Sequence, residues 1–368
     1  MGKIILYGGT FDPVTSEHIN VIKNLTLLNG VEKVIVIPDF QPPHKAQTTT
    51  SAFFRKEMLE IGLKNISNVE ISDFEINGKK AVYSYITVEH FKKIYPDKDL
   101  YFAMGTDMLE CFSEWKNPEK ILQNANVVLI ERTNGGNTEN AIKNFENTYG
   151  KKVLKISYKG KDVSSQEVRC RLYLNLDTQE LITEEVKEYI KNKNLYTPDR
   201  FYFYLSQILP EKRRWHTLGV ILCGKKIAKK LKADEKKVEI ACLLHDNAKY
   251  LNYKDFNGFT LNNVPKQVVH QFLGAFIAEN ILAIKDEQII NAIKYHTTGK
   301  ADMNLIEKIV FTADVIERGR DFDGVEKLRA SVEKDFEKGF RDCICDLYFS
   351  LQQSGIYYLT EQAYLYYK

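Results

Sequence analysis

Three absences narrow what this 368-residue sequence can encode. No apolar stretch approaches the length of about 18 residues that a membrane-spanning helix needs, so we expect no transmembrane segment. The N-terminus enters a strand-like segment without the basic region and long apolar core of a signal peptide. The net charge is only +3, which gives no electrostatic reason to expect a nucleic acid or a membrane surface as partner.

The sequence also lacks the Cys-x-x-Cys motif. Most of its six cysteines lie inside apolar stretches, such as Ile240–Leu244 around Cys242. This favours buried free thiols in a reducing compartment over disulfides. We therefore expect a cytoplasmic protein, and its length allows two domains of ordinary size. Whether it forms a homo-oligomer is left open by the sequence.

The first half of the chain alternates strand-like with helix-like segments. Strands are expected at Ile4–Tyr7, Lys33–Ile37, Leu100–Met104, Val127–Ile130 and Val153–Ile156. Helices are expected at Ile19–Leu28, Ala52–Leu63, Ile86–Tyr95 and Pro118–Leu122. A loop is expected at Asn134–Asn147, which is rich in glycine and asparagine. The alternation predicts an α/β domain with a doubly wound parallel sheet, whose ligands bind beyond the carboxyl ends of the strands.

The pattern changes near Pro198, and residues 200–368 show almost no strand-like alternation. Amphipathic stretches dominate there instead, at Val220–Leu231, Lys236–Ala248, Val268–Ile281, Glu287–Tyr295 and Leu305–Ile316. We therefore expect two domains: an α/β domain over residues 1–196 and an all-helical domain over residues 200–368.

The segment Gly8–His18 joins the first expected strand to the first expected helix. Its paired glycines would let a ligand approach the backbone, and the helix start would offer free N–H groups and the positive end of a dipole. His18 lies in the first turn, where it could stabilise charge on a transferring phosphoryl group. The segment therefore predicts a phosphate-binding site, although α/β proteins also contain turns of this kind without one.

Three later motifs are consistent with the same site. Lys45 follows the second expected strand and could neutralise a polyphosphate, although a solvated turn is the commoner meaning. Trp115 follows a glycine turn at Gly105 and offers a flat face for stacking, with a half-buried core position as the alternative. Val163–Arg169 has the pattern of a helix start, whose hydroxyls and guanidinium could cradle a triphosphate or simply cap a surface helix.

Taken in order, these motifs resemble those of bacterial nicotinate-nucleotide adenylyltransferases, beginning with the superfamily pattern GGTFDP followed by (H/T)xGH. The resemblance covers residues 1–196 and implies transfer of AMP from ATP, with Mg²⁺, to nicotinate mononucleotide, giving deamido-NAD and pyrophosphate. The implied catalytic residues are Thr15, His18 and Lys45. Those implied to hold the pyridine nucleotide are Tyr83, Ser84 and Trp115. Those implied to bind ATP are Gly8, Gly9, Thr10, Phe11, His18, Lys45, Gly105, Asp107, Arg132, Ser164, Ser165 and Arg169.

Histidine and aspartate are adjacent at the end of a strongly apolar helical stretch, at His245 and Asp246. Burying this pair without a partner is costly, and metal ligation would provide a reason for it. Further candidate ligands lie in other helical stretches, namely His216, His270, His296 and Asp314. Any one of them alone is more typical of a helix core. Together they match the H…HD…H…H…D pattern of the HD-domain metal phosphohydrolases.

The surroundings LLHDNAK, YHTTG and ADVIERGRDF resemble the YqeK-type subfamily of these enzymes. The resemblance implies symmetrical hydrolysis of diadenosine tetraphosphate to two ADP. We expect two transition-metal ions, and the nitrogen and oxygen ligands favour iron or manganese. The ligands we assign to one ion are His216, His245 and Asp314, and those to the other are His270 and His296. Asp246 is expected to bridge the two ions.

Cationic side chains near these ligands are candidates for binding phosphate. Lys249, which follows Asp246 closely, is expected to take part in catalysis with it. Arg318 and Arg320 are further candidates, with a solvated surface position as the alternative for both. The expected partners are thus small nucleotides.

Glu17 departs from the adenylyltransferase pattern, which has glycine at this position. A carboxylate beside a polyphosphate repels it, unless the carboxylate faces solvent or contacts Mg²⁺. The departure supports an alternative function, in which the first domain is a degenerate adenine-nucleotide sensor that regulates an HD hydrolase of another signalling nucleotide. Retention of Lys45 and Trp115 argues against that alternative.

Overall fold

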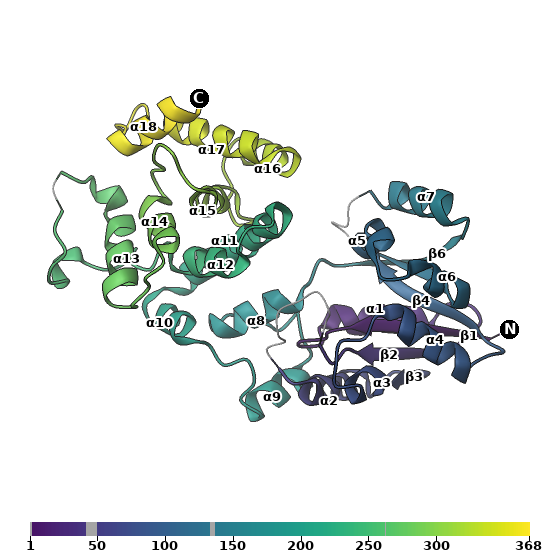
Figure 1. Ribbon diagram of the computed structural model, residues 1–368. Coiled ribbons are helices and arrows are strands. Elements are labelled where there is room, and N and C mark those ends of the chain that lie inside the picture. Colours follow the sequence, from purple (N-terminus) through teal and green to yellow (C-terminus); the bar gives the residue numbers. More distant parts are fainter. Residues whose placement is uncertain (1, 42–49, 133–136, 262) are drawn as a thin grey trace. The chain divides into compact units, whose positions relative to one another are not determined.

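The computed structural model of the chain describes residues 2–41, 50–132, 137–261 and 263–368 (Figure 1). Contacts divide the chain into two compact units. One comprises Met1–Arg169 with Asp177–Thr197, and the other Cys170–Leu176 with Pro198–Lys368. The segment Cys170–Leu176 therefore belongs to the second unit, although it precedes the predicted boundary at residues 196–200. We predict that each of the two halves, residues 1–196 and 200–368, also folds alone.

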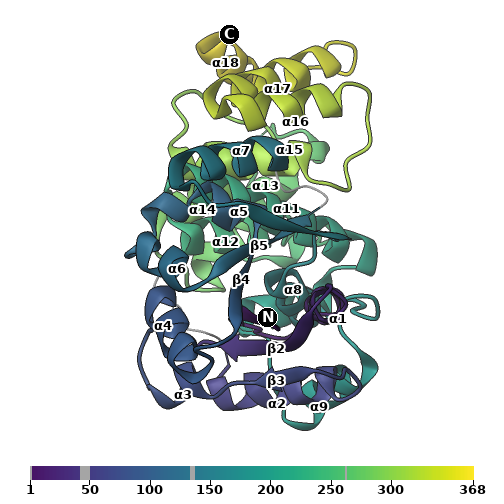
Figure 2. The ribbon, with the colours of Figure 1, turned by 90° about the vertical axis from the view of Figure 1, so that its right-hand side faces the viewer.

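The first unit contains a six-stranded sheet in the order β3-β2-β1-β4-β5-β6, in which all paired strands are parallel. The strands are β1 (Lys3–Gly9), β2 (Val31–Pro38), β3 (Val69–Ile71), β4 (Asp99–Gly105), β5 (Asn126–Arg132) and β6 (Val153–Gly160). Figure 2 shows the sheet with β3 and β2 toward one edge and β5 toward the other. The predicted doubly wound α/β sheet is confirmed, and β3 is the strand that the pattern missed, because it is only three residues long.

Helices cover this sheet, which explains why its central strands are apolar on both faces. Ile5, Leu6 and Val128 are fully buried, as expected for parallel strands between helical layers. The helices are α1 (Ser16–Thr26), α2 (Ala52–Leu63), α3 (Phe74–Asn77), α4 (Ser84–Ile94), α5 (Thr106–Glu110), α6 (Pro118–Asn124), α7 (Thr138–Tyr149), α8 (Ser165–Tyr173) and α9 (Glu184–Asn192). The last of these, α9, packs beside α2 (Figure 1).

The loop expected at Asn134–Asn147 is wrong for most of its length, because α7 begins at Thr138. The Asn137 side chain accepts a hydrogen bond from the backbone N–H of Asn140 and so caps the helix. Ala141 and Phe145, one turn apart, are buried against the unit's core. Asparagine thus acts here as a cap, and the buried stripe outweighs the polar composition.

The second unit is all-helical throughout the part that the structure describes, as predicted. Its helices after the end of α8 are α10 (Arg200–Ile208), α11 (Glu211–Leu231), α12 (Glu235–Leu244), α13 (Val269–Asn280), α14 (Glu287–Tyr295), α15 (Leu305–Ile316), α16 (Val325–Lys334), α17 (Phe336–Ser350) and α18 (Tyr358–Tyr367). The helix α15 packs against both α11 and α14, and α13 packs against α14 (Figure 1). Leu244, Ile309 and Phe311 lie in the fully buried centre of this unit.

Two further expectations can be checked against the structure. All six cysteines are free, and Cys170, Cys242 and Cys343 are buried, as predicted. Within the described residues, none of the helices combines the length and the apolar character that crossing a membrane would require.

Candidate functional sites

The turn between β1 and α1 is shaped by glycine. A side chain at Gly9 would have its Cβ only 2.8 Å from the Phe11 ring, so the missing side chain lets this ring fold inward. Phe11 is 2% exposed, and its ring packs edge-on against the His18 ring with centroids 5.1 Å apart. The Phe11 side chain therefore supports His18 from the core, which leaves its backbone as the part able to contact a nucleotide. Crowding does not require glycine at Gly8, where the nearest atom to a Cβ would be 4.0 Å away.

His18 is oriented by a reciprocal cap at the start of α1. The His18 backbone N–H donates to Thr15 Oγ1 at 3.2 Å, and the Thr15 backbone N–H donates to His18 Nδ1 at 3.0 Å. Because a backbone N–H can only donate, Nδ1 is the accepting nitrogen, and in the neutral ring the hydrogen lies on Nε2. Thr15 is fully buried, so the structure assigns this predicted catalytic residue to the cap that orients His18.

The Glu17 carboxylate does not face solvent. Its side chain is buried, and the hydroxyl of Tyr158 on β6 lies within hydrogen-bond distance of both carboxylate oxygens, at 2.9 and 3.0 Å. Room for the carboxylate comes from Gly160, where a Cβ would lie 2.8 Å from Glu17 Oε1. Burial, reinforced by the bond to Glu17, raises the pKa of Tyr158 to about 12, so the phenol stays protonated and donates. The carboxylate is thus engaged by the sheet.

A buried arginine that the sequence analysis missed holds the same turn. Arg55 on α2 is 0% exposed and donates to the carbonyl oxygens of Thr10 (2.5 Å), Asp39 (2.7 Å) and Phe40 (2.9 Å). The Thr10 hydroxyl in turn donates to Asp39 Oδ2 at 2.8 Å. An arginine among the apolar positions of a helix was the available signal. Its five-donor fork can satisfy several carbonyls at once, which fixes the loop geometry.

The start of α8 contacts the same turn, and a role of its side chains in binding phosphate stays a prediction. Ser165 Oγ donates to the carbonyl of Pro13 at 2.8 Å, and Arg169 Nη1 donates to the carbonyl of Asp12 at 2.5 Å. Ser164 Oγ accepts from the backbone N–H of Glu167 at 3.1 Å and so caps α8. The fold thus brings Ser165 and Arg169 next to residues of the first motif that lie 152 and 157 positions away in the sequence.

The remaining residues predicted to contact the nucleotides lie at the start of α4 and from the end of β4 onward. Gly105 ends β4, Asp107 is exposed on α5, and Tyr83 is 40% exposed before α4, where Ser84 begins the helix. Trp115 is half-buried and packs on Phe102 and Phe112, with ring centroids 6.0 and 5.4 Å away. Trp115 therefore takes the half-buried core position that was the alternative, and its stacking on a nucleotide stays a prediction. Lys45 and the Arg132 side chain lie outside the described residues.

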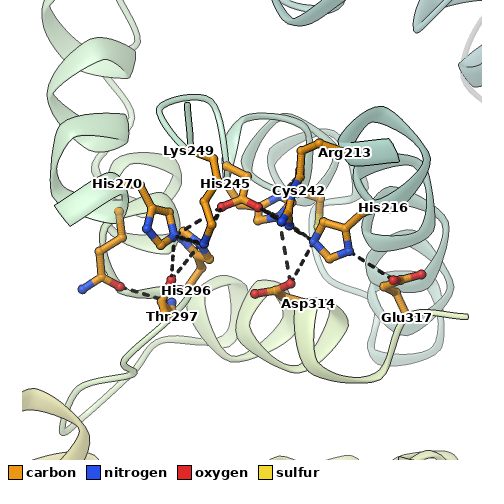
Figure 3. Close-up of polar contacts among 12 residues, drawn as sticks. Arg213, His216, Cys242, His245, Lys249, His270, His296, Thr297, Asp314 and Glu317 are labelled. Atoms are coloured by element: carbon orange, nitrogen blue, oxygen red, sulfur yellow. Dashed lines mark hydrogen bonds and ion pairs between the residues drawn. The ribbon is translucent and has the colours of Figure 1, made fainter. Parts of the chain in front are cut away.

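The six predicted metal ligands converge in the second unit, and Figure 3 labels all of them except Asp246. They lie on five helices or directly after them: His216 on α11, His245 and Asp246 after α12, His270 on α13, His296 after α14, and Asp314 on α15. Two groups of ligand atoms each lie within 4.8 Å of one another, and both contain Asp246. One group adds His216 and His245 to it, and the other adds His270 and His296.

Asp246 is the centre of this arrangement. Its Oδ1 lies 3.2 Å from His270 Nε2 and 3.5 Å from His296 Nε2, and its Oδ2 lies 3.5 Å from His245 Nε2 and 3.9 Å from His216 Nε2. The side chain is only 3% exposed, yet Oδ1 has no hydrogen-bond partner among the described residues. A buried carboxylate oxygen without a hydrogen bond is costly, and a bound cation would compensate it. The residues therefore fit a metal centre.

The histidines present the ring nitrogens that such a centre needs. Nδ1 of His245 lies 2.7 Å from the carbonyl oxygen of Cys242, and Nδ1 of His296 lies 2.8 Å from that of Ile293. A carbonyl accepts, so both Nδ1 atoms carry the hydrogen and both Nε2 lone pairs face the cluster. Asp314 Oδ1 lies 3.1 Å from His216 Nε2, which agrees with its assignment beside that histidine.

Burial and charge set the protonation states of the cluster. Burial lowers the pKa of His245, and it lowers the pKa of His270 to about 4. Burial opposes ionisation of Asp246 and Asp314, but the facing histidines outweigh it and hold both carboxyl pKa values well below their usual range. For His216, burial is outweighed by the carboxylates of Asp314 and Glu317, and its pKa lies above the ordinary value. Ionised carboxylates beside two neutral imidazoles are a suitable ligand set for a cation.

Three cations surround these ligands, and one of them was missed. Arg213, one turn before His216 on α11, donates to Asp246 Oδ2 at 2.7 Å. Lys249 Nζ lies 3.0 Å from His270 Nε2 and 3.7 Å from Asp246 Oδ1, and Arg320 pairs with Asp314. The spacing of three residues from His216 was the signal that could have identified Arg213. Arg318, by contrast, is exposed.

Comparisons with known proteins match both halves of the chain. The cytidylyltransferase-like family model matches residues 6–171, and the HD domain model matches residues 213–319. The chain is 29% identical over 327 residues to a probable nicotinate-nucleotide adenylyltransferase/Ap4A hydrolase of Mycoplasma genitalium, covering 86% of this chain and 88% of that protein. It is 32% identical over 200 residues to a probable nicotinate-nucleotide adenylyltransferase of Clostridium tetani, covering 53% of this chain and 100% of that protein.

A solved structure resembles the second half of the chain. It is described as a predicted HD superfamily hydrolase involved in NAD metabolism from Clostridium acetobutylicum, is 32% identical with a TM-score of 0.42, and covers 46% of this chain and 95% of its own. The match to the Clostridium tetani protein spans that relative completely, and the HD model lies wholly within the helical unit. The chain therefore belongs to the nicotinate-nucleotide adenylyltransferase family, in a form that carries an HD domain after the transferase domain.

Proposed function

We propose that the chain is a bifunctional enzyme. Its first unit transfers AMP from ATP to nicotinate mononucleotide, giving deamido-NAD and pyrophosphate, and its second unit hydrolyses diadenosine tetraphosphate to two ADP. The observation that carries the proposal is the convergence of two His-rich ligand groups on Asp246 in a chain whose first half belongs to the adenylyltransferase family. Both reactions break a phosphoanhydride bond of an adenine nucleotide, and each site offers groups for that chemistry.

The transfer reaction needs positioning and charge neutralisation more than covalent catalysis. The phosphate of nicotinate mononucleotide attacks the α-phosphorus of ATP, and pyrophosphate leaves with the bond electrons. His18, with its donor hydrogen on Nε2, is proposed to stabilise the charge that develops on the phosphoryl oxygens. Lys45, Ser164, Ser165 and Arg169 are proposed to hold the polyphosphate, which ATP brings together with Mg²⁺.

For the hydrolysis, we propose that His216, His245 and Asp314 hold one divalent ion, that His270 and His296 hold a second, and that Asp246 bridges them. When bound, such ions supply a nucleophile derived from water and neutralise charge on phosphate oxygens. The nitrogen and oxygen ligands favour iron or manganese. Arg213, Lys249 and Arg320 bring positive charge to the same place and are proposed to bind the substrate phosphates.

The alternative role of the first unit as a degenerate sensor depended on Glu17. Repulsion of a polyphosphate requires a carboxylate that faces it, whereas this carboxylate is buried and accepts the hydroxyl hydrogen of Tyr158. The geometry therefore removes the main support for the sensor and favours the catalytic proposal.

The transferase proposal is tested by turnover of ATP with nicotinate mononucleotide, and in parallel with nicotinamide mononucleotide. His18→Ala should lower the rate of deamido-NAD formation by at least about a hundredfold, the usual effect of losing a preorganised charge stabiliser. Asp246→Ala, in the other unit, is the matched control and should keep the wild-type rate. A His18→Ala variant with wild-type turnover would show that the site is assigned wrongly.

The hydrolase proposal is tested by metal content and product analysis. Asp246→Ala should lose bound transition metal and the hydrolysis of diadenosine tetraphosphate, because this carboxylate belongs to both ligand groups. ADP should be the main product of the wild type. Formation of AMP and ATP instead, or activity that survives strong chelation, would contradict the proposal.

A further inference from the structure

Beside the six ligands lies a seventh buried acidic group with an unusual contact. Glu317 follows the last residue of α15 and is 2% exposed. Its Oε1 lies 3.1 Å from Nδ1 of His216, the ring nitrogen that does not face the cluster (Figure 3). Because a carboxylate accepts, this contact keeps the hydrogen on Nδ1 and leaves Nε2 as the ligating nitrogen.

This contact makes His216 different from its neighbours in the cluster. Nδ1 of His245 and of His296 faces a backbone carbonyl three residues earlier in its own helix, which is a neutral acceptor. His216 instead faces a carboxylate from another element, since Glu317 lies 101 positions away. A carboxylate acceptor raises the basicity of a ligating imidazole more than a carbonyl does, and it also fixes the orientation of the ring.

The site of Glu317 is shaped to hold the carboxylate in place. Gly219 lies one turn after His216 on α11, and a Cβ there would be only 2.1 Å from Glu317 Oε2. That oxygen accepts a hydrogen bond from the backbone N–H of Gly319 at 2.6 Å. Arg329 donates to the carbonyl of Glu317 at 2.7 Å and so fixes the backbone of this segment. Each carboxylate oxygen thus has its own partner, and the missing side chain at Gly219 makes the space.

We propose that Glu317 is a positioning residue that strengthens metal binding at one of the two ion positions, the one formed by His216, His245 and Asp314. It acts through His216 and does not touch the ion itself. The inference rests on the metal centre of the proposed function. It adds that the two positions differ in affinity, because among the described residues a carboxylate lies on Nδ1 of His216 and neutral carbonyls lie on Nδ1 of His245 and His296. Gly219 takes part by leaving room for it.

The test is a titration of the full chain with Mn²⁺ after its metal has been removed. Calorimetry and electron paramagnetic resonance measure the binding of Mn²⁺. Glu317→Gln should weaken one of the two Mn²⁺ affinities by about 10- to 100-fold, the usual effect of losing an outer-shell partner, and leave the other unchanged. Gly219→Ala should have a similar effect, because the added methyl displaces the carboxylate. Glu307→Gln is the matched control, since Glu307 is a buried carboxylate of α15 that caps the helix start and pairs with Lys300.

Double variants assign the affected position. With His216→Ala, the Glu317→Gln change should have no further effect on Mn²⁺ affinity, whereas with His296→Ala it should keep its full effect. Equal weakening of both positions, or none, in variants that keep the wild-type circular dichroism spectrum would overturn the role of Glu317 alone. A wild-type protein that binds no Mn²⁺, Fe²⁺ or Zn²⁺ would overturn the metal centre as well, which separates the two failures.

Discussion

At the scale of single residues, buried polar side chains do much of the positioning in both units. Arg55 donates hydrogen bonds to the carbonyls of both Thr10 and Asp39. The Tyr158 hydroxyl on β6 donates to the Glu17 carboxylate. Each of these side chains stabilises the fold mainly by satisfying a buried hydrogen-bonding group, because an unpaired buried donor or acceptor costs about 1–3 kcal/mol. Changes at these positions should therefore alter stability and geometry before they alter chemistry.

The Glu17–Tyr158 pair gives a direct test of this view. Tyr158→Phe leaves a buried carboxylate without its donor and should lower the free energy of unfolding by about 1–3 kcal/mol. Glu17→Gly should also destabilise the protein, and it should leave ATP affinity unchanged, because the carboxylate is engaged by Tyr158. Urea unfolding and calorimetric ATP titration measure the two effects, with Tyr149→Phe as the control. Tighter ATP binding by Glu17→Gly would revive the repulsion argument.

Glu75 predicts a pH dependence of stability. Burial, opposed by the hydrogen bond that the Thr87 hydroxyl donates at 2.6 Å and reinforced by Asp39, raises the pKa of Glu75 to about 7. A carboxyl whose folded pKa exceeds its unfolded value of about 4.3 favours the folded state most at low pH, and this stability is lost as the pH rises to about 7.

The variant Glu75→Gln removes this titration. The decline of the melting temperature between about pH 5 and pH 8 should therefore be smaller in Glu75→Gln than in the wild type. Asp107→Asn, an exposed carboxylate of the same unit, is the control and should leave the pH profile unchanged. Parallel profiles for the wild type and Glu75→Gln would show that Glu75 does not titrate in this range.

At the scale of elements, the first turn of α1 is where local sequence and site geometry meet. Thr15→Ala removes the oxygen that accepts from the His18 backbone N–H and should cost about 1 kcal/mol of stability, whereas Thr15→Ser should retain most of it. The loss of the cap should also slow nucleotidyl transfer, because His18 loses part of its orientation. Unfolding followed by Trp115 fluorescence in a Trp215→Phe background reports on this unit. Equal stability of the two variants would contradict the capping role.

At the scale of the whole chain, the two units do not separate cleanly in sequence. Cys170, Leu174 and Leu176 are buried in the core of the second unit, and Arg214 donates to the carbonyls of Leu174 and Asn175. A fragment that begins at residue 200 lacks these contacts, whereas a fragment that begins at residue 165 retains them. The domain boundary predicted from the sequence, at residues 196–200, therefore differs from the boundary between the two packed units.

This difference predicts the behaviour of fragments. Residues 200–368 should fold and bind metal, but with a free energy of unfolding lower by at least about 2 kcal/mol than residues 165–368, because buried leucines are lost. Leu174→Ala in the longer fragment should reproduce part of the loss. Thermal unfolding with and without Mn²⁺ measures both. Equal stability of the two fragments would mean that Cys170–Leu176 adds nothing to the second unit.

Local pattern alone determined the fold class and the order of the two domains, and it predicted candidate residues for both sites. Strand-like runs of four or more residues, helical periodicity and the motifs ending at His18 and Asp246 each follow from short stretches, because apolar spacing and turn chemistry are local properties. The sequence analysis did not predict β3, because three residues are too few to show a strand-like alternation. It did not predict α7, because the asparagines of that segment are typical of a loop.

Only the tertiary structure decided how these residues are used. Whether Glu17 repels a nucleotide or pairs with Tyr158 depends on a strand about 140 positions away, and the partner of His216 lies 101 positions along the chain. The bonds of Arg55 to the Thr10 carbonyl and of Arg213 to Asp246 became visible only in the folded structure. The physical reason is that burial, hydrogen-bond partners and charge neighbours are properties of distant segments packed together, whereas a sequence pattern reports each segment alone.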